Sequence, residues 1–279
     1  MQFYILTSTD YNALVRHFNV AYSNIQVEDA VVVINSLDKE YIEKAKNFCI
    51  EQKIEYYITE SNGTPARGKN SVLEIFLESN NDYCVMVDGD DFLTPHGVWM
   101  YKNLEKSDSP PDAVCLINQK SFRHINNTLY SLQPFTVNYG ELLNSDYYTM
   151  FKEDYGLSSE KAMYFQSLHY KFYAQHRKYS QDYEVHCRVT WLSKKAAQFK
   201  FDEDIAVGED TLHMFELKNQ AVLGNLKFYT TDETPATYVY DERTAGTVMS
   251  VSKFGSDYEW MDEYLNKLQD MEDENKLHE

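Results

Sequence analysis

The sequence predicts an α/β protein with a doubly wound, mostly parallel sheet flanked by helices. Segments of strand and helix character alternate through the first 120 residues of the 279-residue chain. Ala30–Asn35 is a continuous, largely β-branched apolar run, which is typical of a parallel strand covered by helices on both faces. An acidic cluster follows directly after another such run, where parallel sheets bind their ligands.

The first part of this region predicts three strands with two helices between them. Apolar residues recur at helical spacing over 11–24, which predicts the first helix. The second helix is expected over 38–52, with Ser36 or Asp38 as its capping residue. The three strands are expected over 3–7, 30–35 and 55–59.

The second part continues the same alternation. A helix over 67–78 leads to an apolar strand over 83–87, and a helix follows over 96–106. Ser109-Pro110-Pro111 ends that helix, because proline cannot continue it. A fifth strand is expected over 113–117. This order predicts a ligand site outside the carboxyl ends of the strands.

Composition and charge exclude some classes of function. The chain has 26 Lys and Arg against 44 Asp and Glu, a formal net charge of −18. That charge argues against a generic nucleic-acid or membrane-surface binder, because phosphate-rich partners are normally met by a basic face. The apolar content of 43% and charged content of 25% indicate a globular rather than a disordered protein.

The chain has the features of a soluble protein of the cytoplasm. No apolar run approaches the roughly 20 residues of a membrane-spanning helix. The first residues lack the basic and then apolar segments of a secretory signal. The four cysteines are far apart and form no CxxC pair, so we expect reduced thiols and no membrane span.

Two common nucleotide-binding motifs are missing. No GxGxxG follows the first strand, and no GxxxxGK[ST] occurs anywhere in the chain. The sequence therefore supports neither a dinucleotide-binding fold nor a P-loop. Ser8-Thr9-Asp10 stands at the first turn, where side-chain hydrogen bonds could hold a nucleotide instead.

Asp88-Gly89-Asp90-Asp91 is the first motif with a chemical meaning. Carboxylates this close repel one another, and a hard divalent cation that bridges them to a diphosphate relieves the repulsion. An acidic Asx-type turn is the alternative. The position directly after an apolar strand favours the metal site.

Val207-Gly208-Glu209-Asp210 is the second motif and opens an expected helix. A carboxylate there can be a general base. It can also be only a capping charge, because the N-terminal end of a helix favours anions. Its order after the acidic cluster makes it the place to look for a base.

The third motif is Gly63-Thr64-Pro65-Ala66-Arg67-Gly68-Lys69-Asn70. Arg67 and Lys69 could neutralise a diphosphate, and Asn70 could hydrogen-bond a base or a ribose. A proline-led helix start with solvated charges is the alternative, and the motif alone favours it.

Together these elements resemble the GT-A glycosyltransferases, particularly the large family-2-like group. The resemblance rests on three elements in order and covers roughly residues 3 to 250. They are the Gly-x-x-x-Arg-x-x-Asn helix start, the strand ending in the acidic cluster, and Phe201-Asp202-Glu203 followed by Glu209-Asp210. The family implies a Rossmann-like GT-A fold with a nucleotide sugar across the carboxyl edge of the sheet. The resemblance suggests UDP-glucose as the donor.

The same resemblance assigns roles to the acidic residues. Asp90, with Asp88 or Asp91, would hold Mg²⁺ or Mn²⁺ on the donor diphosphate and offset charge on the leaving group. Asp210 would be the general base, with Glu209 as its neighbour in the motif. Attack opposite the leaving nucleotide would invert the configuration.

Several donor contacts follow from shorter matches to the family. Positions that match its contacts to the nucleotide base and ribose are Thr7, Thr9, Asp10, Asn35 and Asp38. Arg243 matches the arginine of a mobile loop that closes over the donor, although a plain surface loop is equally compatible with the sequence. The usual Gln-x-x-Arg-Trp acceptor helix is absent, which argues against a processive polysaccharide synthase.

Residues 161–200 are the candidate acceptor region. They carry eight Lys and Arg against two acidic residues, together with nine aromatic residues. Basic and aromatic side chains suit a nucleic-acid or glycan acceptor. The alternative is a set of core helices with solvated cations.

Three hypotheses for the function of the protein stay open. The chain has a basic window and a composition that hints at AT-rich coding (23 Tyr but 10 Gly). In build it is similar to the T-even phage enzymes that add glucose to glucosylated hydroxymethylcytosine in DNA. A bacterial transferase for surface polysaccharide or glycoprotein is the second hypothesis. A non-catalytic nucleotide-sugar-binding module is the third.

We expect one GT-A domain over 1–256 followed by an acidic tail. The domain divides into a nucleotide-sugar-binding half (1–120), an acceptor-side helical region (121–200), and the base motif with its closing loop (201–256). The tail, 257–279, is predicted to be an amphipathic helix packed on the domain, with a homodimer contact as the alternative.

Overall fold

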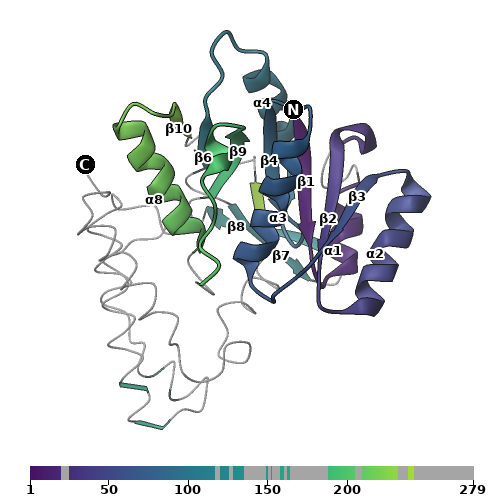
Figure 1. Ribbon diagram of the computed structural model, residues 1–279. Coiled ribbons are helices and arrows are strands. Elements are labelled where there is room, and N and C mark those ends of the chain that lie inside the picture. Colours follow the sequence, from purple (N-terminus) through teal and green to yellow (C-terminus); the bar gives the residue numbers. More distant parts are fainter. Residues whose placement is uncertain are drawn as a thin grey trace.

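A seven-stranded mixed sheet forms the centre of the protein in a computed structural model (Figure 1). The described residues are 1–19, 25–116, 120–125, 128–134, 188–204, 209–231 and 238–241, with isolated positions between 149 and 163. From one edge to the other, the strands are β10 (Phe228–Thr231), β6 (Ala113–Leu116), β9 (Arg188–Ser193), β4 (Tyr83–Asp88), β1 (Gln2–Thr7), β2 (Ala30–Asn35) and β3 (Glu55–Thr59).

The sheet is parallel except at β9. This strand is antiparallel to both of its neighbours, β4 and β6, and the other neighbouring pairs are parallel. The predicted α/β class with a mostly parallel sheet flanked by helices is therefore confirmed. The central antiparallel strand is a difference from the sequence prediction, which assigned these residues to an acceptor-side helical region.

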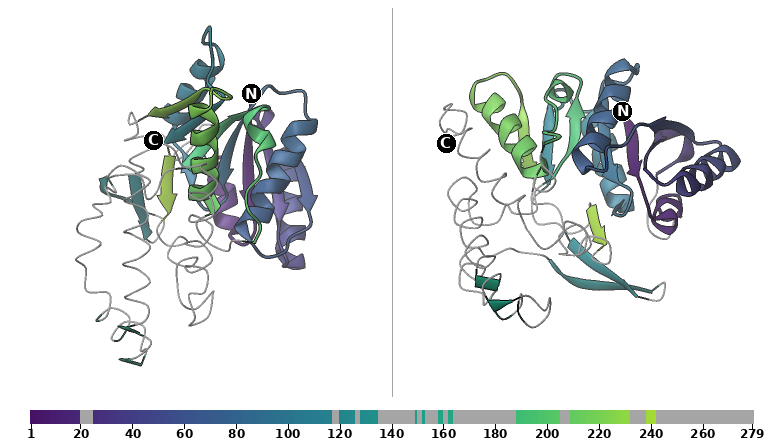
Figure 2. Two further views of the ribbon diagram at one scale, coloured as in Figure 1. Left: turned by 60° about the vertical axis from the view of Figure 1, so that its left-hand side comes forward. Right: turned by 60° about the horizontal axis from the view of Figure 1, so that its bottom comes forward.

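Helices cover both faces of the sheet (Figure 2). On one face α3 (Pro65–Glu78) contacts β1 and β2, and α8 (Glu209–Val222) contacts β9 and β10. Their buried apolar side chains share one core with Tyr4, Val31 and Val33. On the other face α1 (Tyr11–Arg16), α2 (Lys39–Gln52) and α4 (Pro95–Glu105) pack on residues such as Phe3 and Val32. Because successive side chains of a strand point to opposite faces, β1 and β2 supply both cores.

Local capping signals set most of the helix starts. Asp38, one of the two predicted caps, accepts hydrogen bonds from the backbone of Glu40 and Tyr41 at the start of α2. Thr64 caps α3 and is followed by proline at the first helical position. The first helix is shorter than predicted, since α1 ends at Arg16 and residues 20–24 lie outside the described part of the chain.

A second sheet brings a distant segment beside the acidic turn. It has the order β5 (Phe92–Leu93), β11 (Tyr238–Asp241), β7 (Lys120–Ile125) and β8 (Thr128–Pro134). β11 pairs antiparallel with β5, which directly follows the acidic cluster. The end of β11 therefore runs toward that cluster. Arg243, the candidate of the closing loop, lies outside the described residues.

Two further expectations concern cysteines and membranes. Cys49, Cys84 and Cys115 are free and buried, as expected for reduced thiols, and Cys187 lies outside the described residues. Within the part of the chain that the structure describes, no helix is both long and apolar enough to span a bilayer. The acidic tail, 257–279, also lies outside that part.

Candidate active site

The carboxyl edge of the main sheet gathers candidate residues from three strands. Thr7 ends β1, Asn35 ends β2 and Asp88 ends β4. The strand register pairs Thr7 with Ile34 and Leu6 with Asp88, so these strand ends lie side by side. The edge is where a parallel sheet binds its ligands.

Thr7 and Asn35 are buried and make hydrogen bonds inside the fold. The Thr7 hydroxyl bonds the hydroxyl of Tyr41 in α2. The Asn35 amide donates to Thr59 Oγ1 at 2.9 Å and to the carbonyl of Glu60 at 3.0 Å. Both residues therefore join elements that meet at the carboxyl edge, and their contacts with a nucleotide stay a prediction.

The other base and ribose candidates begin the first two helices. The Asp10 carboxylate accepts from the backbone of Ala13 at 3.0 Å and caps α1. Asp38 caps α2, as described above, and Thr9 is exposed in the turn between β1 and α1. Asp10 and Asp38 both cap their helices through the carboxylate oxygen Oδ1. A nucleotide contact by these residues also stays a prediction.

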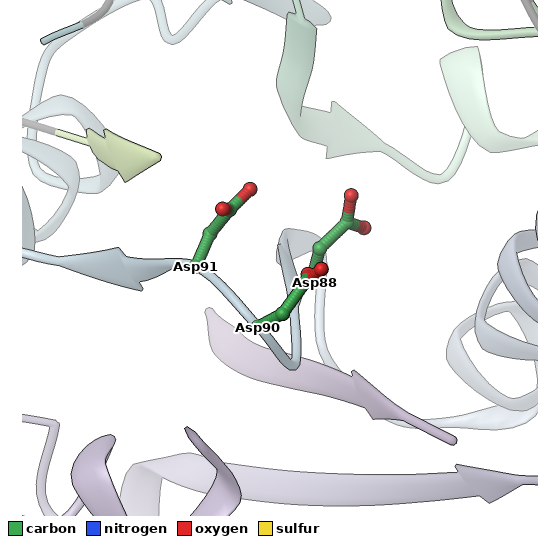
Figure 3. A group of neighbouring side chains, drawn as sticks. All are labelled: Asp88, Asp90 and Asp91. Atoms are coloured by element: carbon green, nitrogen blue, oxygen red, sulfur yellow. The ribbon is translucent and has the colours of Figure 1, made fainter. Parts of the chain in front are cut away.

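The acidic turn after β4 forms a compact carboxylate cluster. Asp88, Asp90 and Asp91 each offer a carboxylate oxygen, and these oxygens lie within 4.8 Å of one another. The Asp88 and Asp91 side chains extend to the same side of the turn (Figure 3). Three hard oxygen donors this close fit Mg²⁺ or Mn²⁺, which bind carboxylates together with substrate phosphates.

Gly89 allows this turn to lie against the end of β1. A Cβ atom at this position would be 2.5 Å from the carbonyl oxygen of Leu6 and 2.9 Å from the Cα of Thr7. These are backbone atoms that cannot rotate away, so the close approach requires glycine. The glycine thereby fixes how near the carboxylates stand to the strand ends.

Two residues at the end of α1, which the sequence analysis missed, contact the backbone of the acidic turn. The Arg16 guanidinium donates to the carbonyl oxygen of Asp90 at 2.5 Å and lies over the ring of Phe92. The His17 Nε2 lies 3.2 Å from the carbonyl oxygen of Gly89, and His17 is fully buried. Burial lowers the pKa of His17 to about 3, so the neutral ring donates this bond.

Removing the His17 donor should weaken metal binding. We expect His17→Met to raise the dissociation constant for Mn²⁺ by about 10-fold, because partners that orient ligand groups are typically worth 10–100-fold in affinity. His17→Gln is the matched control, since its amide can donate from nearly the same place. Electron paramagnetic resonance of free Mn²⁺ measures the dissociation constant for each variant. If His17→Met bound Mn²⁺ as tightly as the wild type and His17→Gln, this hydrogen bond would have no role in metal binding.

The second acidic motif lies at the start of α8 and is paired with a lysine of α3. Lys69 Nζ donates to Glu209 Oε1 at 2.8 Å and also to a carboxylate oxygen of Asp210. Lys69 and Glu209 are buried, whereas a quarter of the Asp210 side chain is exposed. Burial raises the pKa of Glu209, and Asp210 adds to the rise, while the Lys69 ammonium opposes it.

One pocket brings the predicted metal and base motifs together. Asp88 of the acidic turn and Asp210 of α8 both line it, as does Lys69. The strand β9, which the sequence analysis missed, contributes Val189 and Thr190 to the wall. The full lining is Lys69, Met86, Asp88, Val189, Thr190, Phe201, Asp210 and His213.

The start of α3 is tied to the Phe-Asp-Glu segment. The Asn70 amide donates to the carbonyl of Phe201 at 2.9 Å, and the backbone of Phe201 donates back to Asn70 Oδ1 at 2.8 Å. Asn70 and Arg67 both reach the Glu203 carboxylate, and Arg67 also pairs with Glu74. Arg67 and Asn70, the two residues of this motif predicted to contact the nucleotide, thus link α3 to the Phe-Asp-Glu segment. Their contacts with a nucleotide sugar stay predictions.

His213, also in the pocket wall, makes the fold sensitive to acid. Its ring stacks on Phe201 at 3.9 Å, its Nε2 donates to the carbonyl of Phe199 at 3.0 Å, and burial lowers its pKa to about 4. Between about pH 6.5 and pH 4 the unfolded chain therefore binds a proton that the folded chain does not. The stability contributed by neutral His213 is lost as the pH falls through this window.

Urea denaturation at pH 7 and pH 5 checks this sign. The His213 contribution should lower the free energy of unfolding by about 2 kcal/mol between these pH values. His213→Gln removes the titrating group and keeps an amide donor, so its loss should be smaller by this amount. Equal losses in the two proteins would mean that folded His213 titrates normally.

Comparisons with known proteins find similar structures but no family. The sequence matches no protein-family model and no curated protein. S. aureus TarS matches with 16% sequence identity and a TM-score of 0.49 over 89% of this chain. S. aureus TarS 1-349 in complex with UDP-GlcNAc matches with 16% identity and a TM-score of 0.48 over 86% of this chain. The mannosyltransferase PcManGT from Pyrobaculum calidifontis in complex with GDP-Man and Mn²⁺ matches with 10% identity and a TM-score of 0.47 over 86% of this chain. This chain spans 38%, 58% and 56% of these three chains.

Proposed function

We propose that this chain is a metal-dependent, inverting glycosyltransferase of the GT-A type that transfers a sugar from a nucleotide sugar to an acceptor hydroxyl. The observation that carries the proposal is that one pocket is lined both by Asp88 of the carboxylate cluster and by Asp210 of α8. The pocket lies at the carboxyl edge of a mostly parallel sheet, the usual place for a nucleotide ligand.

In this proposal the two acidic motifs act at opposite ends of the transfer. Asp88, Asp90 and Asp91 hold Mg²⁺ or Mn²⁺, which when bound offsets the charge on the diphosphate leaving group. Asp210 takes the proton of the acceptor hydroxyl as its oxygen forms a bond to the anomeric carbon. The bond from that carbon to the diphosphate breaks, the nucleoside diphosphate leaves, and the configuration inverts.

The finer part of the proposal concerns donor and acceptor. We keep UDP-glucose as the donor, on the sequence resemblance alone, and sugar-modified DNA as the acceptor hypothesis. Four of the eight cations of the window 161–200 lie in 188–200, in β9 and the segment that follows it, and Trp191 of β9 is fully buried. The DNA hypothesis therefore depends on residues 161–187, and a surface glycan is the competing acceptor.

A panel of nucleotide sugars tests the coarse function without knowledge of the acceptor. We expect at least one donor to be hydrolysed in the presence of Mg²⁺ or Mn²⁺, and hydrolysis to stop with EDTA and return with the metal. No release of nucleoside diphosphate from any donor would favour a binding module. The best donor, with a label in its sugar, is then offered together with modified duplex DNA or with lipid-linked glycan. The acceptor that receives the label distinguishes the two acceptor hypotheses.

A further inference from the structure

Lys69 is a buried ammonium group inside a helix. Only 5% of the residue is exposed, although it stands between the half-buried Arg67 and the buried Asn70 at the start of α3. A buried cation is costly unless oppositely charged or hydrogen-bonding groups surround it. Lys69 pairs with the carboxylates of Glu209 and Asp210, and its ammonium lies 5.5 Å from the centre of the Phe201 ring.

The two carboxylates differ in what they can reach. Glu209 is 6% exposed and is not among the residues that line the pocket. Asp210 lines the pocket, and 25% of its side chain is exposed. Only Asp210 can therefore meet an acceptor hydroxyl in the pocket, while Glu209 faces Lys69 inside the protein.

The three charges form one cluster at the junction of α3 and α8. Glu209 and Asp210 are consecutive and repel each other, and the ammonium between them offsets that repulsion. The start of α8 also favours anions, but its peptide dipole does not fix the direction of either carboxylate. Lys69 can fix that direction, because its ammonium donates hydrogen bonds to both carboxylates from α3. His213 and Asp88 are the other titratable groups in the same pocket wall.

We propose that Lys69 is a positioning residue that holds the Asp210 carboxylate at the pocket wall, and that Glu209 is the counter-charge that keeps the ammonium buried rather than a second base. The inference rests on the proposed function, because it takes Asp210 as the base. It assigns distinct roles to two neighbouring acidic residues that the motif alone does not separate.

Charge-balanced variants separate positioning from folding. Lys69→Met leaves Glu209 and Asp210 without the cation, so we expect a lower melting temperature and a kcat for donor hydrolysis reduced about 100-fold, the cost of misplacing a reacting group by about 1 Å. The double variant Lys69→Met with Glu209→Gln removes both buried charges. It should recover the melting temperature, while kcat stays about 100-fold low because Asp210 still lacks the Lys69 ammonium.

Two controls complete the experiment. Lys46→Met, in α2, makes the same substitution at a partly exposed lysine that pairs with Glu43 of the same helix. This variant should leave kcat and melting temperature unchanged. Glu209→Gln alone keeps Lys69 on Asp210, so its kcat should fall less than that of Lys69→Met. An unchanged donor KM in all variants would localise the effect to the base side.

The outcomes distinguish this inference from the proposed function. Recovery of kcat together with melting temperature in the double variant would overturn it, since Lys69 would then act on folding alone. A Lys69→Met variant as active as the wild type would also overturn it. Absence of turnover by the wild-type protein with every donor is a different result, which overturns the proposed function and the inference with it.

Discussion

Replacing Asp88 with asparagine should reduce metal-dependent turnover by at least about 100-fold, because a metal on the leaving group is worth several kcal/mol in the transition state. Asp88 is the residue that both belongs to the carboxylate cluster and lines the pocket. An amide in its place keeps the size but removes a negative charge and one anionic oxygen. The dissociation constant for Mn²⁺ should rise together with the loss of turnover.

Nucleoside diphosphate release at increasing Mn²⁺ concentration measures this effect. Asp82→Asn is the matched control, because Asp82 is exposed and immediately precedes the opposite end of the same strand, β4. The control should keep both the turnover and the Mn²⁺ affinity of the wild type. If Asp88→Asn behaved like Asp82→Asn, the carboxylate cluster would not be the metal site.

Most of the sheet could be predicted because its strands carry strong local signals. The β-branched run Ala30–Asn35 and the segment Glu55–Thr59 form β2 and β3 with the predicted bounds. The central strand β9 was missed, since the sequence Arg188–Ser193 mixes charged, polar and apolar residues and stands in a basic window. Its place depends on pairing with β4 and β6, which are distant in sequence, and no local pattern encodes that pairing.

The candidate site divides in the same way. The acidic turn and the Glu209-Asp210 pair are contiguous motifs, so the sequence reveals them directly. His17 was not assigned to the site, and Lys69 was considered only as a diphosphate contact, because the partners that define their positions lie far away in the chain. Lys69 contacts Glu209, 140 residues later, and His17 contacts Gly89, 72 residues later.

Replacing Asp210 with asparagine should lower kcat by about 100- to 10,000-fold, the range typical for loss of a general base. The amide keeps the shape of the side chain but cannot accept the proton of the attacking hydroxyl. Stability should not fall, because Lys69 keeps its pair with Glu209 and the repulsion between consecutive carboxylates is removed. Mn²⁺ affinity should not change either, since Asp210 is not part of the carboxylate cluster.

Release of nucleoside diphosphate from the best donor measures this loss, with water in place of the acceptor hydroxyl. Asp204→Asn is the control, because Asp204 is an exposed residue close to the same motif. A drop in kcat with Mn²⁺ affinity and melting temperature retained would separate the base from the metal site and from the fold. A turnover of Asp210→Asn within about threefold of the wild type would be far above the turnover expected after loss of a base. The proton acceptor would then be another group in the pocket.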